Sequence, residues 1–211
     1  MTKVQWFFDY VSPFSYLQWQ HQLPKLKDAE IQLRPVLFAG LLKHWGHKGP
    51  AEIPGKRRYT YRHTLWLAER LGVPFRVPGA HPFNPLPLLR LGIVRDNHLE
   101  IVQRLFDFVW RDGHIPAEPT PWGELLTELD VNEEELKDPG VKQRLFDNGE
   151  EALSKGVFGV PTSVVDGEVF WGVDGFDFLL DYLRNPAVIR TPAMRAADKL
   201  PSGVQALHKS P

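Results

Sequence analysis

The chain has 211 residues, of which 43% are hydrophobic and 24% charged, and its formal net charge is −1. This composition is typical of a globular protein, and the charge balance gives no indication of a nucleic-acid or anionic-membrane partner. The absence of cysteine excludes disulfides, thiolate metal ligands and redox cycling on a protein thiol. No apolar run reaches the ~18 residues of a membrane span, and the start lacks a signal-peptide pattern, so we expect a cytoplasmic protein.

The chain opens with the pattern of a β-α-β unit. Residues 4–10 are apolar and rich in aromatic side chains, which predicts a buried strand. Ser12 and Pro13 follow as a favourable N-cap and first residue of a helix that extends over about residues 14–27. Residues 31–37 alternate and predict a second strand, which such a unit places parallel to the first.

The middle of the chain, residues 39–154, has mostly helical patterns with loops between them. The predicted helices cover residues 57–71, 86–96, 99–111, 121–129 and 141–154. Gly72 ends the first of these helices. We therefore expect a large all-helical insertion.

Strand patterns return near the end of the chain. Residues 161–165 and 168–171 flank Asp166-Gly167, which is a strong signal for a tight hairpin. A final helix over residues 176–183 follows, with Asp174 as its capping residue.

This order of elements is that of an α/β thioredoxin-like core with its usual insertion enlarged. The core would be discontinuous, with residues 1–38 and 155–185 pairing into one sheet around the insertion. Residues 186–211 contain few apolar side chains, and we expect a loosely ordered C-terminal tail there.

Ser12-Pro13-Phe14-Ser15 stands at the junction where thioredoxin-like proteins carry Cys-x-x-Cys. A serine hydroxyl cannot form a disulfide, but it can donate a hydrogen bond to the thiolate of a bound thiol. The positive end of the helix dipole would add to that stabilisation. Ser12 is therefore the candidate catalytic residue, and the alternative is that it serves only as an N-cap.

Two further segments have the pattern of a binding site. Val160-Pro161 comes directly before a predicted strand, where the thioredoxin core has a cis proline beside the first helix and a peptide can add as an extra strand. The alternative is an ordinary trans bond. Asp174 can pair with an ammonium group, or it can act only as a helix cap.

Residues 8–17 read Phe-Asp-Tyr-Val-Ser-Pro-Phe-Ser-Tyr-Leu and resemble the opening motif of the 2-hydroxychromene-2-carboxylate isomerases. These enzymes are relatives of the kappa-class glutathione transferases and of the DsbA-like oxidoreductases. Further motifs follow in the family's order, and the resemblance spans about residues 4–184. They are Pro54-Gly55-Lys56, Leu71 to Pro74, Pro82 to Leu86, Gly156 to Thr162 and the segment around Asp174.

The resemblance implies glutathione as cofactor. It assigns Ser12 to the glutathione sulfur and Lys56 to a carboxylate of glutathione. Val160, with Pro161, would supply backbone hydrogen bonds, and Asp174 would hold the γ-glutamyl ammonium group.

The chain departs from the family pattern at two positions. His47 stands where we expect a glutathione-contacting Asn, and it can still donate a hydrogen bond; Gly175 stands where the family often has Arg. His47 and His44 lie three residues apart, but no third ligand is evident near them, so we expect no metal site.

The substrate side of the predicted site consists of Phe14, Lys56 and Asn84. The basic run that begins at Lys56 precedes a predicted helix, an unfavourable place for cations unless an anion binds there, and the alternative is an ordinary solvated helix face. Asn84 lies between two prolines, and its alternative role is that of a turn residue.

The implied function is a glutathione-dependent cis-trans isomerase that acts on 2-hydroxychromene-2-carboxylate or a similar aromatic unsaturated keto acid, in a protein that the resemblance predicts to be a homodimer. Two alternatives remain open: a kappa-like glutathione transferase or peroxidase, and a non-catalytic DsbA-fold binding protein. A dithiol oxidoreductase is excluded because the chain has no cysteine to oxidise.

Overall fold

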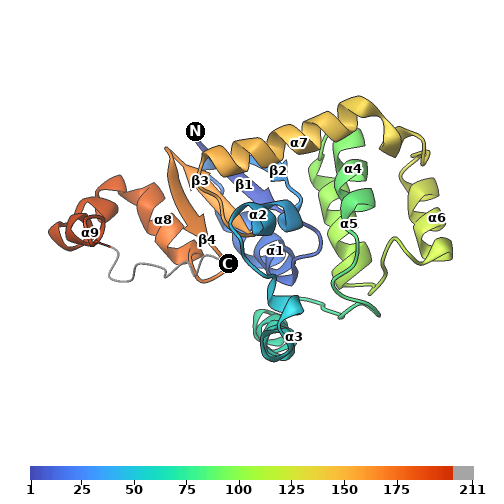
Figure 1. The fold of residues 1–211 in the computed structure, drawn as a ribbon, viewed down its shortest axis with the longest axis horizontal. Coiled ribbons are helices and arrows are strands. Elements are labelled where there is room, and N and C mark those ends of the chain that lie inside the picture. Colours follow the sequence, from blue (N-terminus) through green and yellow to red (C-terminus); the bar gives the residue numbers. More distant parts are fainter. Residues whose placement is uncertain (202–211) are drawn as a thin grey trace, which may run out of the picture. The chain divides into compact units, whose positions relative to one another are not determined.

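The computed structural model describes residues 1–201, and the chain divides into two units, residues 1–176 and 177–211. The first unit contains a four-stranded sheet with the strand order β2-β1-β3-β4 (Figure 1). The strands are β1 (Thr2–Phe8), β2 (Ala29–Pro35), β3 (Thr162–Val165) and β4 (Glu168–Trp171). β1 pairs in parallel with β2, whereas β1 with β3 and β3 with β4 are antiparallel. The predicted thioredoxin-like fold class is therefore confirmed.

The β3–β4 hairpin forms at the predicted turn. Asp166 and Gly167 both have positive φ, 52° and 87°, as the tightest hairpin turns require. A glycine adopts this conformation without a steric penalty, which explains why the dipeptide predicts the turn so well.

The predicted helix over residues 14–27 is not a regular α-helix. α1 (Pro13–Leu17) continues as a π-helical turn over Gln18–Gln22 and a 3-10 turn over Leu23–Lys25. Pro24 explains the irregular end, because it has no N–H to donate to the turn before it.

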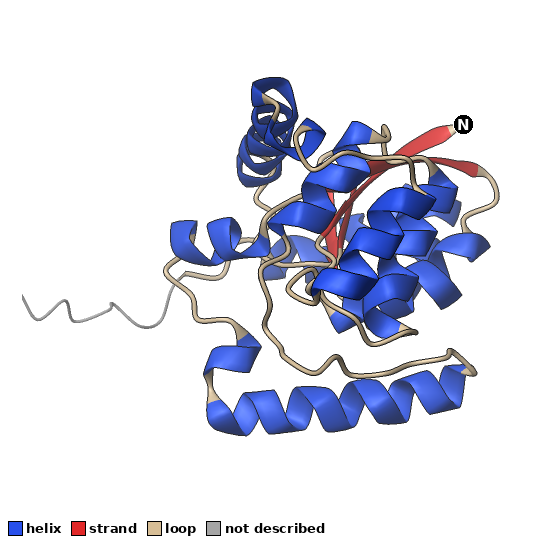
Figure 2. Ribbon diagram, turned by 90° about the vertical axis from the view of Figure 1, so that its right-hand side faces the viewer, coloured by secondary structure: helices blue, strands red, loops and turns tan. Residues whose placement is uncertain are grey.

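The segment between the two halves of the sheet folds as helices. All five predicted helices form, with ends shifted by at most three residues, and α2 is an additional helix that the sequence pattern does not predict. The helices are α2 (Phe38–His44), α3 (Pro54–Leu71), α4 (Leu86–Val94), α5 (Leu99–Trp110), α6 (Pro119–Glu128) and α7 (Pro139–Ser154). α3 is seen end-on at the bottom of Figure 1 and lengthwise at the bottom of Figure 2, and Gly72 ends it with φ of 66° as predicted.

The end of β1 is buried on both faces, which is why Trp6 to Phe8 form a continuous apolar run. On one face, the Phe8 and Tyr10 rings lie 5.7 and 4.8 Å from the ring of Phe106 in α5. On the other face, Phe7 belongs to a cluster that also includes buried side chains of α2, α7 and β3. The sheet is thus covered on both sides, and its edges carry the loops described below.

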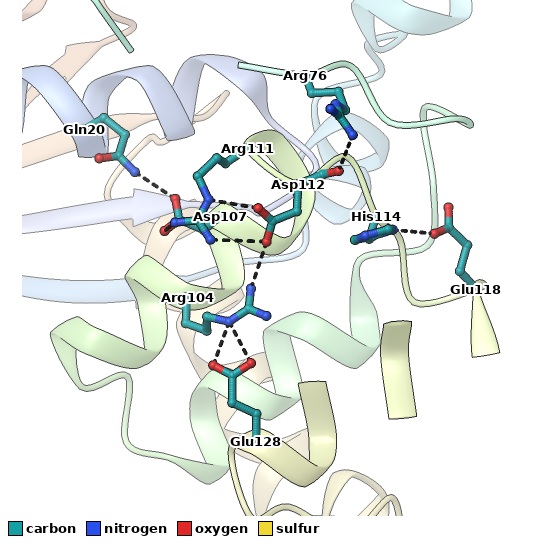
Figure 3. Close-up of polar contacts among 9 residues, drawn as sticks. All are labelled: Gln20, Arg76, Arg104, Asp107, Arg111, Asp112, His114, Glu118 and Glu128. Carbon is teal, nitrogen blue, oxygen red and sulfur yellow. Dashed lines mark hydrogen bonds and ion pairs between the residues drawn. The ribbon is translucent and has the colours of Figure 1, made fainter. Parts of the chain in front are cut away.

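A network of charged side chains ties the end of α5 to α6 (Figure 3). Arg104 contacts Glu128 at 2.8 Å and Asp112 at 3.3 Å, and Arg111 contacts Asp107 at 2.6 Å. Most of these groups are partly exposed, so each pair is expected to contribute less than about 1 kcal/mol.

The second unit contains helices, two of them in the part of the predicted C-terminal tail that the structure describes. Nearly all of α8 (Phe176–Arg184) belongs to it, followed by a 3-10 helix over Pro186–Arg190 and by α9 (Pro192–Ala197). Thr191 caps α9 by accepting a hydrogen bond from the N–H of Met194, a signal that the sequence analysis did not use. The rest of the predicted tail, residues 202–211, lies outside the described residues. Among the helices of the described part, none is both long and apolar enough to cross a membrane.

Candidate functional site

The β1–α1 turn and the loop before β3 lie at the same edge of the sheet. β1 ends at Phe8, and residue Phe7 pairs with Thr162 in the antiparallel register. Val160 and Pro161, directly before β3, therefore lie alongside the turn that leads to Ser12. The Val160–Pro161 peptide bond is cis, which confirms the prediction made from the thioredoxin core.

A cavity of about 1070 Å³ opens at this edge of the sheet. Its walls are the β1–α1 turn, α2, the start of α3, the loop of residues 46–53, residues 81–83 with Pro85, and the loop that ends at Val160. Small-molecule pockets typically measure roughly 300–1,000 Å³, so this one has room for a tripeptide and a second small molecule.

Ser12 lies in the wall of this cavity and is 7% exposed. Its Oγ accepts a hydrogen bond of 3.1 Å from the backbone N–H of Ser15, so the residue does cap α1. A hydroxyl has one donor and two acceptor positions, and the cap uses only one acceptor. The Ser12 O–H therefore stays available as a donor, and the two roles weighed for this residue are compatible.

Asp9 is a buried acidic group in the cavity wall that the sequence analysis did not single out. Its two carboxyl oxygens accept hydrogen bonds from the N–H groups of Val11, at 3.0 Å, and Phe38, at 2.9 Å. Burial raises the pKa of Asp9 to about 7 despite these hydrogen bonds. The available signal was a single acidic residue within the aromatic run of residues 6–10.

The structure brings most of the predicted site residues together around the cavity. They are Ser12, Phe14, His47, Lys56 and Val160. The exposed His47 and Lys56 place two basic side chains at the rim, which suits an anionic ligand. Phe14 contributes an aromatic wall next to His63, at 5.8 Å between ring centroids.

Three predicted residues do not line the cavity. Asn84 is exposed, and its side-chain oxygen accepts the N–H of Leu86 at 3.1 Å, which is the turn role considered as its alternative. Asp174 is exposed just beyond β4, and Pro161 is buried behind Val160. Within residues 1–201, no group of three or more His, Cys, Asp or Glu side chains is placed to hold a metal ion.

Two aromatic side chains at the cavity were also missed by the sequence analysis. Phe158 and Trp171 have ring centroids 5.2 Å apart and are 39% and 52% exposed. A side chain at Gly159 would come within 2.7 Å of the indole nitrogen of Trp171, so the glycine lets this ring lie against the backbone. Large exposed rings beside a cavity are suited to stacking on an aromatic ligand.

Residues 3–184 match the family of the DSBA-like thioredoxin domain. The chain belongs to this family. It is 28% identical to a 2-hydroxychromene-2-carboxylate isomerase of Sphingobium xenophagum, over 87% of this chain and 99% of that protein. It is also 28% identical to glutathione S-transferase kappa 2 of Caenorhabditis elegans, over 87% of this chain and 92% of that protein.

Among solved structures, that of a 2-hydroxychromene-2-carboxylate isomerase matches this chain with a TM-score of 0.73. The match covers 94% of this chain and all of the other, at 22% identity, and it shows a shared fold. The resemblance drawn from residues 8–17 and the motifs that follow is thereby confirmed at the level of the family.

Proposed function

We propose that this protein is a glutathione-dependent cis-trans isomerase of 2-hydroxychromene-2-carboxylate or a similar aromatic unsaturated keto acid. The observation that carries the proposal is the Ser12 hydroxyl, whose proton is free to donate into a cavity large enough for two ligands. The names of the related proteins, an isomerase and a glutathione transferase, support the same class of chemistry.

In the proposed complex, the cysteinyl backbone of glutathione pairs with Val160 and its sulfur faces Ser12. Lys56 and His47, at the rim, bind a carboxylate group of glutathione. The γ-glutamyl end extends out of the cavity past the end of β4, where its ammonium pairs with the exposed Asp174. The hydrogen bond from Ser12 favours the thiolate over the thiol, and each pKa unit of that preference corresponds to about 1.4 kcal/mol.

The proposed reaction uses this thiolate as a borrowed nucleophile. The hydroxychromene ring first opens to the unsaturated keto acid. The thiolate then adds to the conjugated double bond, and the electron pair of that bond moves to the carbonyl oxygen as an enolate. The former double bond is now single and can rotate. When the enolate collapses, the carbon–sulfur bond breaks, the trans isomer forms and the thiolate returns unchanged. Phe14, Phe158 and Trp171 offer aromatic walls for the substrate ring.

Ser12→Ala tests the proposal. Removing one donor that stabilises a charge in an active site typically lowers kcat by roughly 100-fold or more, and we expect a loss of this size in glutathione-dependent turnover. Loss of the cap also destabilises the fold by about 1 kcal/mol, which thermal unfolding will measure separately.

Ser15→Ala is the matched control, because the Ser15 side chain is buried in the same turn region and does not line the cavity. Turnover by this variant should stay close to that of the unmodified protein. If Ser12→Ala is as active as Ser15→Ala, the assignment of Ser12 to the sulfur is wrong.

The two alternative functions give different readings in the same assays. A kappa-like transferase consumes glutathione as product forms, whereas an isomerase leaves its concentration constant. A non-catalytic binding protein of this fold gives no heat of glutathione binding in calorimetry.

The homodimer stays a prediction, which light scattering can test. α3 exposes Tyr59 and Trp66, at 66% and 51%, as side chains that a partner could cover.

A further inference from the structure

Two aromatic N–H groups hold the backbone immediately before Ser12. The indole nitrogen of Trp110 donates to the carbonyl oxygen of Tyr10 at 2.8 Å. The Nε2 atom of His81 lies 2.7 Å from the carbonyl oxygen of Val11, the next residue along the chain. A carbonyl oxygen only accepts hydrogen bonds, so His81 carries its proton on Nε2.

The other ring nitrogen of His81 is also fixed. Its Nδ1 atom lies 2.8 Å from the hydroxyl of Tyr61, a residue of α3, which also reaches the His81 carbonyl oxygen at 3.2 Å. Burial lowers the pKa of His81. The hydrogen bond to Val11 acts in the opposite direction and the cation of Arg57 in the same one, and the net lowering favours the neutral ring. In the neutral ring Nδ1 is an acceptor, and the single O–H proton of Tyr61 is shared between Nδ1 and the His81 carbonyl oxygen.

The imidazole of His81 cannot turn freely, because aromatic rings surround it. Its centroid lies 5.4 Å from that of Trp110, 5.5 Å from that of Tyr61 and 6.1 Å from that of Phe83. The hydrogen bond to Val11 is therefore held in direction as well as in length.

The peptide group between Val11 and Ser12 is consequently fixed at both of its polar atoms. His81 holds its carbonyl oxygen, and its N–H, which belongs to Ser12, donates to the carbonyl oxygen of Asp9 at 3.0 Å. A fixed peptide group fixes the Cα atom of Ser12 and with it the origin of the side chain that faces the cavity.

We propose that His81, held by Tyr61, is a positioning residue for Ser12 and orients its hydroxyl toward the sulfur of bound glutathione. This inference rests on the proposed function and adds to it two residues of the helical insertion, His81 and Tyr61. His81 also lines the cavity, and the role inferred for it here acts through the backbone of Val11.

His81→Phe is the main variant, because phenylalanine keeps an aromatic ring among Tyr61, Phe83 and Trp110 but has no N–H. We expect the thiol pKa of bound glutathione to rise and kcat to fall roughly tenfold, since small displacements of a catalytic group are costly. The dissociation constant of glutathione, measured by calorimetry, should change less than about twofold, because binding depends on Val160 and the basic rim. The thiolate absorbance in the ultraviolet reports the pKa.

Two further variants separate positioning from packing. His81→Gln has a side-chain amide that can donate toward Val11, and it should recover most of the kcat lost in His81→Phe. Tyr61→Phe removes the donor to Nδ1 but leaves the Nε2 donor, so we expect a smaller loss, about threefold. The matched control is His114→Phe, because His114 also contacts an aromatic ring, that of Phe108 at 5.6 Å, but it pairs with Glu118 and does not line the cavity (Figure 3).

The outcomes distinguish this inference from the proposed function. If His81→Phe melts earlier but keeps the thiol pKa and kcat, His81 has only a structural role and the inference is overturned. If the unmodified protein binds no glutathione, the proposed function fails instead. The inference is then tested by nuclear magnetic resonance, which locates the proton of the His81 imidazole. A proton on Nε2 supports the inference, and a proton on Nδ1 contradicts it.

Discussion

The turn before α1 and the surface of α5 use polar groups in opposite ways. At the turn the polar groups are few and buried, and the Asp9 carboxyl and the N–H groups of Trp110 and His81 each have defined backbone partners. On α5 the network of Figure 3 joins Arg104 and Asp112 with several neighbours, and most of these groups are partly exposed. The α5 network thus has more polar contacts than the turn before α1, but each of its contacts stabilises the fold less because solvent screens it.

One carboxyl group from each region shows what the difference means. Burial raises the pKa of Asp9 to about 7, so the folded protein disfavours its charge. At Asp112, burial acts in the same direction but is outweighed by the hydrogen bonds and charges of Arg111 and Arg104, and its pKa is lowered. The fold therefore tolerates an unfavourable carboxylate beside Ser12, whereas it pairs the carboxylate of Asp112 with two arginines.

The largest expected effect comes from Asp9 and concerns stability against pH. Below its ordinary pKa of 3.8, the carboxyl holds its proton in both the folded and the unfolded state. Between pH 3.8 and about 7 only the unfolded state releases the proton, so the free energy of unfolding falls as pH rises, by roughly 4 kcal/mol at most. Above about pH 7 this contribution is constant. Urea unfolding across this range will measure the slope.

Asp9→Asn removes this titration and should flatten the profile between pH 4 and 7. Asp112→Asn is the matched control with the opposite sign, because a lowered pKa stabilises the fold at neutral pH and loses that effect as pH falls toward acid. Parallel profiles for the unmodified protein and Asp9→Asn would contradict the role assigned to burial.

The second largest effect tests the donor to the carbonyl of Tyr10. Trp110→Phe leaves that buried carbonyl without its hydrogen bond, which typically costs about 1–3 kcal/mol, and it also removes volume from the core. Trp122→Phe is the matched control: Trp122 is also buried, but its indole donates to Glu133, an exposed residue whose carboxylate can turn to water instead. Equal losses of unfolding free energy in the two variants would show that the hydrogen bond from Trp110 stabilises the fold no more than the exposed one from Trp122.

The sequence predicts those parts of the site that are encoded by neighbouring residues. Ser12 followed by Pro13 determines the start of α1, and Asp166 followed by Gly167 determines the β3–β4 turn, because both signals act within a few residues. α2 was missed for the converse reason. Leu37 at its start has no side-chain cap and Gly40 interrupts its first turn, so no local signal marks it.

Residues that act through distant backbone atoms could not be found this way. His81 lies 70 positions from Val11, and Trp110 lies 100 positions from Tyr10. Their acceptors are carbonyl groups, which every residue has, so no pairing of residue types along the chain points to these contacts. For the same reason Asn84 could be assigned to the cavity or to a turn from its sequence alone, and only its hydrogen bond to Leu86 places it in the turn.

The smallest expected effect lies in the network on α5. Arg104→Ala removes the contacts of this side chain with Glu128 and Asp112, yet we expect the free energy of unfolding to fall by less than about 1 kcal/mol, because solvent screens the pairs. High salt should reduce even this difference, since the screening length shortens to roughly 3 Å at 1 M. Urea unfolding at low and high salt measures both. A loss as large as that of Trp110→Phe, and insensitive to salt, would mean that the network behaves as a buried one, and the contrast between the turn and α5 would no longer hold.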